Sequence, residues 1–346
     1  MSDKLTKTPG FYAATRDAKR VMLLDLGFLG DSIHLLPALW VLRQSYPDAE
    51  LHVMVSEHVT KIMEVAPWID RIWGYPRFPR GPKWYQDFGR VRQLRTAKFD
   101  VVVNLNGSDR SSILTGLSGA RWRLGRRPED GGPAFWSAMF THIVEHPYKA
   151  ELISTQRWQC LRKAGFPGEK PEVRIEIPAD AKRRALEKAG GDGGWIHVSP
   201  FTTVNYRELS FEQMAGFLST LNQTTKRRII LTCAGNERER SRMSELLGRL
   251  DFAPWRVFCG DLDLLEYAAI VSMSSLHLGG DSGGNHVAWM SGVPSVTWYR
   301  DFEGLSEWIL QGEDCMAFVG EQNDTGIRGI DSSDLLLASI KQLQKR

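Results

Sequence analysis

The chain has 346 residues, of which 42% are hydrophobic and 25% are charged, and its formal net charge is +3. This is the composition of a soluble globular protein, the length favours two domains, and the mild charge gives no argument for a nucleic-acid partner, so we expect none. Four widely spaced cysteines without a C-x-x-C pair argue against a zinc ribbon or a disulfide framework, and no apolar run suits a signal peptide or a membrane-spanning helix.

The first half of the chain alternates short apolar runs with helical patterns. Residues 21–26 form a continuous apolar run, typical of a strand buried on both faces of a parallel sheet. A glycine turn then leads into a helix predicted over 33–45. Further strands are predicted at 51–55, 69–73 and 99–104, and further helices at 59–66, 112–117 and 151–165. This order predicts a Rossmann-like domain.

The second half repeats the alternation after a stretch rich in Pro and Gly at 166–171. Strands are predicted at 194–199, 228–233, 257–258, 276–279 and 295–299, and helices at 211–223, 238–250, 264–273, 284–291 and 331–345. We therefore expect an α/β protein of two Rossmann-like βαβ domains facing each other across a cleft, with domains at 1–168 and 169–328. The last helix, within 329–346, could pack back on the first domain.

Two glycine turns are candidate ligand sites. Residues 278–286 read LGGDSGGNH between a predicted strand and a predicted helix, a combination that suits a phosphorylated ligand because a helix N-terminus offers unpaired N–H groups. The alternative is an ordinary turn with an Asp or Ser N-cap. Gly30, Asp31 and Ser32 follow the first strand, where Asp31 could act as a general base or simply cap the helix.

Other patterns are weaker. Residues 142–146 read HIVEH, a metallopeptidase-like string, but a proline follows at once and we expect no metal. Asp263 is better explained as an N-cap than as part of a D-x-D metal motif. Motifs for NAD, ATP and serine hydrolysis are absent. Two basic clusters in the first half either bind an anion or form a solvated surface: Arg77, Arg80 and Lys83, then Arg121, Arg123, Arg126 and Arg127.

Two motifs together resemble glycosyltransferase family 9, the bacterial lipopolysaccharide heptosyltransferases. Residues 30–39 read GDSIHLLPAL and are similar to the family's G-D-x-x-H-x-x-P-A-L, and residues 281–288 read DSGGNHVA and are similar to its D-[ST]-G-x-x-H-x-A. The resemblance covers nearly the whole chain. It implies a GT-B fold and an inverting, metal-independent glycosyltransferase that moves a heptose from ADP-L-glycero-D-manno-heptose to a lipopolysaccharide inner-core sugar.

The resemblance also assigns residues. It implies that Asp31 is the catalytic base. Arg207 stands where the family usually has a lysine, and Leu209 replaces its tryptophan. The donor-binding residues that it implies are Ser199, Pro200, Arg207, Glu237 or Glu239, Leu262, Asp281, Ser282, Gly283, Gly284 and His286. With the basic clusters, the expected acceptor-binding residues are Gly30, His34, Arg77, Arg80, Lys83, Arg110, Arg121 and Arg123.

No cofactor is expected beyond the nucleotide sugar itself, which is a substrate. The expected partners are that donor and a lipid-linked core oligosaccharide. The expected location is the cytoplasm, with peripheral contact at the inner membrane left open. Two alternatives remain: another GT-B enzyme that uses a different nucleotide sugar, either a sugar transferase or an epimerase, and a non-catalytic binding protein on this fold.

Overall fold

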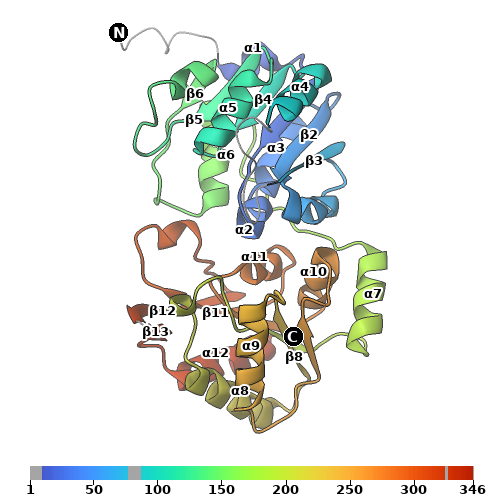
Figure 1. Cartoon of the computed structure of the whole chain (residues 1–346), viewed down its shortest axis with the longest axis vertical. Coiled ribbons are helices and arrows are strands. Elements are labelled where there is room, and N and C mark those ends of the chain that lie inside the picture. Colours follow the sequence, from blue (N-terminus) through green and yellow to red (C-terminus); the bar gives the residue numbers. More distant parts are fainter. Residues whose placement is uncertain (1–9, 77–86, 324–325, 346) are drawn as a thin grey trace. The chain divides into compact units, whose positions relative to one another are not determined.

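The computed structural model describes residues 10–76, 87–323 and 326–345. The chain divides into two compact units, Met1–Val173 and Arg174–Arg346 (Figure 1). The sequence placed this boundary after residue 168, inside the Pro and Gly stretch. None of the helices in the described part of the chain is sufficiently long and apolar to cross a membrane.

The first unit is built on a parallel sheet with the strand order β3-β2-β1-β4-β5-β6. Helices α4 and α5 pack together along one side, whereas α3 packs with α6 (Figure 1). Its elements are α1 (Phe11–Thr15), β1 (Arg20–Leu24), α2 (Leu29–Ile33), α3 (Leu36–Ser45), β2 (Glu50–Ser56), the 3₁₀ helix η1 (Glu57–Val65), β3 (Arg71–Tyr75), α4 (Asp87–Ala97), β4 (Val101–Asn104), α5 (Asp109–Leu117), β5 (Trp122–Arg126), η3 (Trp136–Met139), β6 (His142–Val144) and α6 (Ile153–Lys163).

The predicted helix over 33–45 is found as α3, three residues shorter at its start, and the glycine turn predicted before it contains the separate short helix α2. The short α2 ends at Ile33 and α3 begins at Leu36 with Pro37 in its first turn. Proline lacks an N–H group and has a fixed φ, so it favours a helix start and not a helix interior. The chain therefore turns between the two helices, and Gly30 and Asp31 lie on the short helix α2 and not on α3.

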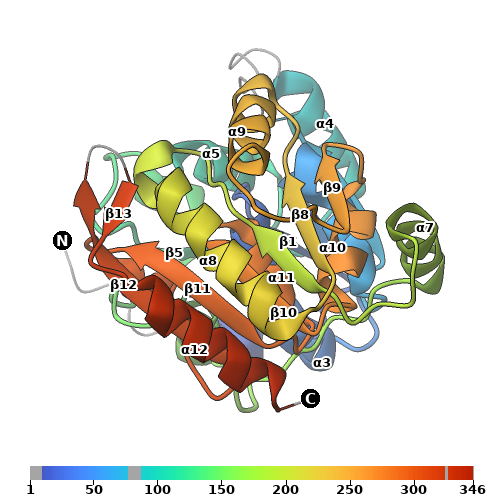
Figure 2. The same ribbon diagram turned by 90° about the horizontal axis from the view of Figure 1, so that it is seen from below.

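The second unit has the strand order β13-β12-β11-β10-β7-β8-β9, in which only β12 and β13 pair antiparallel. Figure 2 shows α8 and α12 side by side over one face of this sheet, with α10 and α11 behind it. Its elements are α7 (Ala179–Ala189), β7 (Ile196–Ser199), η4 (Asn205–Arg207), α8 (Phe211–Thr225), β8 (Ile229–Cys233), α9 (Glu237–Leu247), β9 (Arg256–Cys259), α10 (Leu264–Ser272), β10 (Leu276–Gly280), α11 (Gly283–Met290), β11 (Ser295–Arg300), η5 (Leu305–Glu307), β12 (Cys315–Asn323), β13 (Gly326–Arg328) and α12 (Ser332–Leu343).

Helix α12 belongs to the second unit. Leu335, Ala338 and Leu343 are buried in the same core as Phe217 of α8 and Trp298 of β11. The sequence allowed this helix to pack back on the first domain. In the structure its apolar face covers the second sheet beside α8, which removes that face from water.

Helix α7 was not predicted from the sequence. Its buried stripe consists of Ala181, Ala185 and Ala189, which are small and stand among charged residues. A stripe of alanines gives a weak hydrophobic signal, although the spacing of four residues is helical. The helix ends at Gly190, whose φ of 67° is left-handed, as expected for a glycine C-cap.

Candidate functional site

The first unit has its topological switch point between β1 and β4, the two neighbouring strands from which the sheet grows in opposite directions. Ligands of open α/β sheets bind beyond the carboxyl ends of such strands. Asp25 follows β1, and its Oδ1 accepts hydrogen bonds from the Gly27 N–H (2.8 Å) and from Asn106 Nδ2 (3.2 Å) in the loop after β4. The two loops at the switch point are thus joined by one buried carboxylate.

Arg157 of α6 is the buried cation that balances Asp25. Its Nη2 donates to Asp25 Oδ2, and the two side chains are 3% and 1% exposed. Its Nη1 donates to the main-chain oxygen of Asp31 (2.6 Å), and Nη2 lies 3.6 Å from Asp31 Oδ1. Neither Asp25 nor Arg157 was singled out from the sequence, yet both hold the loop that carries Asp31.

Asp31 lies in the first turn of α2. Its Oδ2 accepts a hydrogen bond from the Phe28 N–H (2.9 Å), so the side chain does cap the helix, as one of the two sequence readings expected. The other oxygen faces Arg157, and the side chain remains 20% exposed. A carboxylate that is fixed by a cap and a cation and still reaches solvent can accept a proton from a bound hydroxyl.

The other predicted acceptor residues are spread over the first unit. Gly30 and His34 are buried, and Arg110 follows β4 on α5, 3.9 Å from Asp87. Arg121 and Arg123 lie near the start of β5, where Trp122 pairs with Val101 at the amino end of β4. That is the edge of the sheet opposite to Asp31. Arg77, Arg80 and Lys83 lie outside the described residues.

The pairing register of β4 with β5 therefore places Arg121 and Arg123 away from the switch point. Arg121 stacks over the Trp122 ring at 5.2 Å. Arg123 donates to the carbonyls of Ala120 (2.6 Å) and Met139 (2.9 Å), and its burial lowers the pKa of its guanidinium. Arginine density along the sequence cannot distinguish such internal contacts from a ligand-binding cluster.

A cavity of about 420 Å³ lies at the ligand-binding edge of the first unit. Its walls come from loops that follow the carboxyl ends of β4, β5 and β6. The lining residues are Gly107, Pro128, Glu129, Asp130 and Tyr148.

The second unit has its switch point between β7 and β10. Ser199 ends β7, and Asp281 directly follows β10. Arg207 Nη1 donates to Asp281 Oδ2 at 3.2 Å, and the Arg207 side chain is 31% exposed. Burial raises the pKa of Asp281, while Arg207 and Arg300 act in the opposite direction. The structure thus places Arg207 beside Asp281, a pairing that the sequence did not predict.

Three glycines of the 278–286 stretch lie so close to other parts of the protein that an added side chain would collide there. A Cβ on Gly280 would lie 2.9 Å from Trp298 Nε1, and one on Gly279 would lie 2.8 Å from Asn285 Oδ1. A Cβ on Gly284 would collide with the Tyr267 hydroxyl. From the sequence, this glycine turn was a candidate site for a phosphorylated ligand. In the structure, Asp281, Ser282 and Gly283 are the partly exposed residues of the turn.

A hydrogen-bonded chain of buried side chains supports this turn from behind. Asn285 Nδ2 donates to the Gly280 carbonyl (2.7 Å), and Asn285 Oδ1 lies 2.9 Å from His277 Nε2. His277 Nδ1 and His197 Nδ1 are 2.8 Å apart, and His197 Nε2 reaches Thr232 Oγ1 at 2.9 Å. Burial lowers the pKa of His277 to about 4 and that of His197 well below its ordinary value, so both rings are neutral near pH 7.

His286 is also buried and neutral. Burial lowers its pKa to about 4, and its ring packs against Trp308 with the ring centroids 6.0 Å apart. Ser199 lies 3.1 Å from the Tyr267 hydroxyl, and Pro200 is buried beside it. Among the predicted donor residues, these three therefore offer little surface to a ligand in this state.

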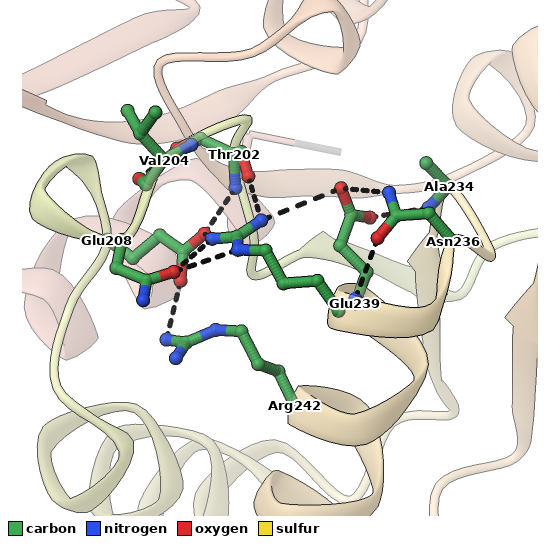
Figure 3. A network of polar contacts seen from close by, with 9 residues as sticks. Thr202, Val204, Glu208, Ala234, Asn236, Glu239 and Arg242 are labelled. Carbon is green, nitrogen blue, oxygen red and sulfur yellow. Dashed lines mark hydrogen bonds and ion pairs between the residues drawn. The ribbon is translucent and has the colours of Figure 1, made fainter.

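A second polar network holds the loop that carries Arg207 (Figure 3). Glu208 is 1% exposed, accepts the Thr202 N–H (2.8 Å), and pairs with Arg238 at 2.7 Å and Arg242 at 2.6 Å. Arg238 also donates to the Thr202 carbonyl (2.8 Å). Because Glu208 directly follows Arg207, this network fixes the backbone from which Arg207 projects.

The two candidate ribose-binding glutamates differ in their surroundings. Glu239 is buried and accepts the Ala234 N–H at 2.6 Å, as Figure 3 shows, so it supports the loop after β8. Glu237 begins α9 and is exposed. Leu262 is half-buried just before α10. Of these three residues, Glu237 and Leu262 are more accessible to a ligand than Glu239.

The metal-like strings have structural roles. His142 lies on β6, and His146 Nε2 contacts Glu151 Oε1 at 3.1 Å. Asp263 is the N-cap of α10, as predicted, and forms a capping box with Glu266. Across residues 10–76, 87–323 and 326–345, no group of three or more His, Cys, Asp or Glu side chains is arranged to hold a metal ion.

Comparisons with known proteins identify the family of this chain. The sequence profile of glycosyltransferase family 9 (heptosyltransferase) matches residues 89–304. The chain is 22% identical to lipopolysaccharide heptosyltransferase 3 of Escherichia coli over 78% of its length and 80% of that protein. A family 9 glycosyltransferase structure from Veillonella parvula matches with a TM-score of 0.80 at 19% identity, covering 95% of this chain and 98% of the other.

A further solved structure, an E. coli heptosyltransferase with ADP-2-deoxy-2-fluoro heptose, has a TM-score of 0.70 at 19% identity and covers 94% of this chain and 99% of the other. These likenesses establish the GT-B fold that the sequence predicted. The family profile spans more than half of the chain. The chain therefore belongs to glycosyltransferase family 9, the heptosyltransferase family, and is a glycosyltransferase.

Proposed function

We propose that this enzyme transfers a heptose from ADP-L-glycero-D-manno-heptose to a sugar of the lipopolysaccharide inner core, with inversion at the anomeric carbon. Membership in the heptosyltransferase family supports the reaction class. The name of the E. coli relative supports a lipopolysaccharide acceptor, and the ADP-2-deoxy-2-fluoro heptose in the similar structure supports an ADP-linked donor.

Asp31 is the proposed base, and its position carries the proposal. Its carboxylate is 20% exposed beside the switch point of the first sheet and is held by Phe28 and Arg157. In the reaction, an acceptor hydroxyl oxygen bonds to the anomeric carbon while the bond from that carbon to the diphosphate oxygen breaks. The electron pair leaves with ADP, and the hydroxyl proton passes to Asp31. A single displacement of this kind inverts the anomeric configuration.

The second unit would bind the nucleotide. The N–H groups at the start of α11 and the Arg207 guanidinium would stabilise the charge that develops on the leaving diphosphate. Glu237 would accept hydrogen bonds from the ribose hydroxyls, and Leu262 would contact the adenine. On this account the leaving group is neutralised by protein groups, and transfer requires no metal ion.

The first unit would bind the acceptor. The cavity next to Asn106 has the carboxylates of Glu129 and Asp130, which accept hydrogen bonds from sugar hydroxyls, and the ring of Tyr148. Arg110, on the same edge, would meet a core phosphate. The lipid-linked acceptor implies action on the cytoplasmic face of the inner membrane, with peripheral contact.

Two measurements test the proposal. Thermal shift with ADP, UDP, GDP and CMP, each with and without EDTA, should show stabilisation by ADP that EDTA leaves unchanged. Proton NMR of the product should show an anomeric configuration opposite to that of the donor. Stabilisation by UDP alone, or an ADP shift that EDTA abolishes, would reject the donor assignment or the metal-free mechanism.

A further inference from the structure

The Asp31 carboxylate sits on a helix that cannot fix its own position. Helix α2 has five residues, from Leu29 to Ile33, and none of its capping contacts comes from an N-cap side chain that accepts a hydrogen bond. Helices this short are not stable by themselves in water. The orientation of Asp31 therefore depends on tertiary contacts to α2.

Arg157 supplies such contacts from α6, 126 residues further along the chain. One guanidinium makes two different connections to Asp31: Nη1 donates to its main-chain oxygen at 2.6 Å, and Nη2 lies 3.6 Å from its carboxylate. The same Nη2 donates to Asp25 Oδ2. The planar fork of arginine can serve all three groups, whereas the single ammonium of a lysine cannot.

Asp25 fixes the position of the Arg157 guanidinium. Its other oxygen is held by the Gly27 N–H at 2.8 Å and by Asn106 at 3.2 Å, so the Asp25 carboxylate is tied to the ends of β1 and β4. Both partners of the Arg157–Asp25 pair are at most 3% exposed. Removing one partner would leave a buried uncompensated charge, so a stabilising role alone would account for the pair. It would not account for the two further connections to Asp31.

We propose that Arg157, anchored on Asp25, is a positioning residue that orients the Asp31 carboxylate toward the acceptor hydroxyl. The inference rests on the proposed role of Asp31 as the base. It predicts that loss of the Arg157 guanidinium lowers kcat even in a variant that stays folded.

The test compares four variants: Arg157→Lys, the double variant Asp25→Asn with Arg157→Gln, Asp31→Asn, and Arg162→Gln as a control on the same helix. The double variant replaces the buried ion pair by a neutral pair, so it removes the guanidinium contacts to Asp31 without leaving an uncompensated buried charge. For each, kcat, the KM for a lipopolysaccharide inner-core acceptor, ADP affinity and the melting temperature are measured, with the assay run well below the lowest melting temperature.

The proposal expects Arg157→Lys and the double variant to lose about 100-fold in kcat, since a misplacement of about 1 Å has that effect. Acceptor KM and ADP affinity should stay within about threefold, because an interaction made in the transition state is lost from kcat. Arg162→Gln should equal the wild type in every quantity. Wild-type kcat in either test variant would overturn the proposal, and so would a kcat loss that the fraction of unfolded protein at the assay temperature fully explains, which indicates a purely structural role. Wild-type turnover by Asp31→Asn would instead reject the proposed base.

Discussion

Arg207 Nη1 donates to Asp281 Oδ2 at 3.2 Å within the second unit. The cation proposed to meet the leaving diphosphate is thus already paired with the first residue of the donor turn. Burial raises the pKa of Asp281, and the charges of Arg207 and Arg300 act in the opposite direction by stabilising its carboxylate. A bound diphosphate would compete with Asp281 for the same guanidinium. In the absence of donor, the pair would keep the Arg207 side chain oriented toward the donor turn.

Replacing Arg207 by glutamine should lower kcat by about 100-fold, the cost of removing one group that stabilises developing negative charge. Arg207→Lys should lose less, because it keeps the charge. The measurement is steady-state ADP release, with Arg183→Gln as the control, since Arg183 lies exposed on α7 and pairs with the exposed Glu187 of the same helix. Equal rates for Arg207→Gln and the control would contradict the assigned role.

Glu208→Gln should destabilise the second unit by about 3 kcal/mol, because it leaves two arginines facing a buried neutral group. The matched control is Glu245→Gln, which breaks an exposed pair with Arg249 and should cost less than about 0.5 kcal/mol. Urea denaturation measures both. Since Glu208 also fixes the backbone of Arg207, the first variant should lose turnover as well. Similar unfolding free energies for the two variants would argue against the network of Figure 3.

The buried histidines predict an acid-sensitive fold. The pKa of His277 is about 4 when folded and about 6.5 when unfolded, so below pH 6.5 the unfolded chain binds more protons. The free energy of unfolding should therefore be fully retained above pH 6.5. It should fall as the pH drops toward 4, by up to about 1.4 kcal/mol per pH unit for each such histidine. In His277→Gln the slope between pH 6 and 4.5 should be shallower. An unchanged slope would mean that His277 does not titrate as described.

Gly284→Ala should weaken ADP binding and lower the melting temperature, because the new methyl group collides with the Tyr267 hydroxyl. Overpacking of this kind costs about 1–3 kcal/mol. Adding Tyr267→Phe removes the hydroxyl and should recover most of the loss, whereas Tyr267→Phe alone should be mild. If the double variant is as defective as Gly284→Ala, the Tyr267 hydroxyl is not the reason why a glycine is required here.

Much of the fold could be predicted from the sequence because buried parallel strands appear as continuous apolar runs, such as Val101 to Val103, and N-caps such as Ser210 and Asp331 mark helix starts. The misses have physical causes. Pro37 starts a new helix, the stripe of α7 consists of alanines, and most residues of β12 are only partly buried or exposed.

The site was only partly predictable. A local motif identifies the turns that carry Asp31 and Asp281, since the chemistry and the backbone geometry there are encoded in consecutive residues. Arg157 and Asp25 stand 132 positions apart, and no local pattern connects them. A charged residue directly after the buried strand β1 was the available signal for Asp25. The arginines near the start of β5 show the converse, because only strand register reveals at which edge of the sheet they lie.

The central claim is that Asp31 accepts the proton of the attacking hydroxyl. The direct measurement is single-turnover transfer from ADP-heptose to a purified inner-core acceptor by Asp31→Asn, with ADP affinity determined by calorimetry on the same protein. The account predicts a rate at least about 100-fold below that of the wild type, with ADP affinity unchanged. A wild-type transfer rate in Asp31→Asn would contradict it.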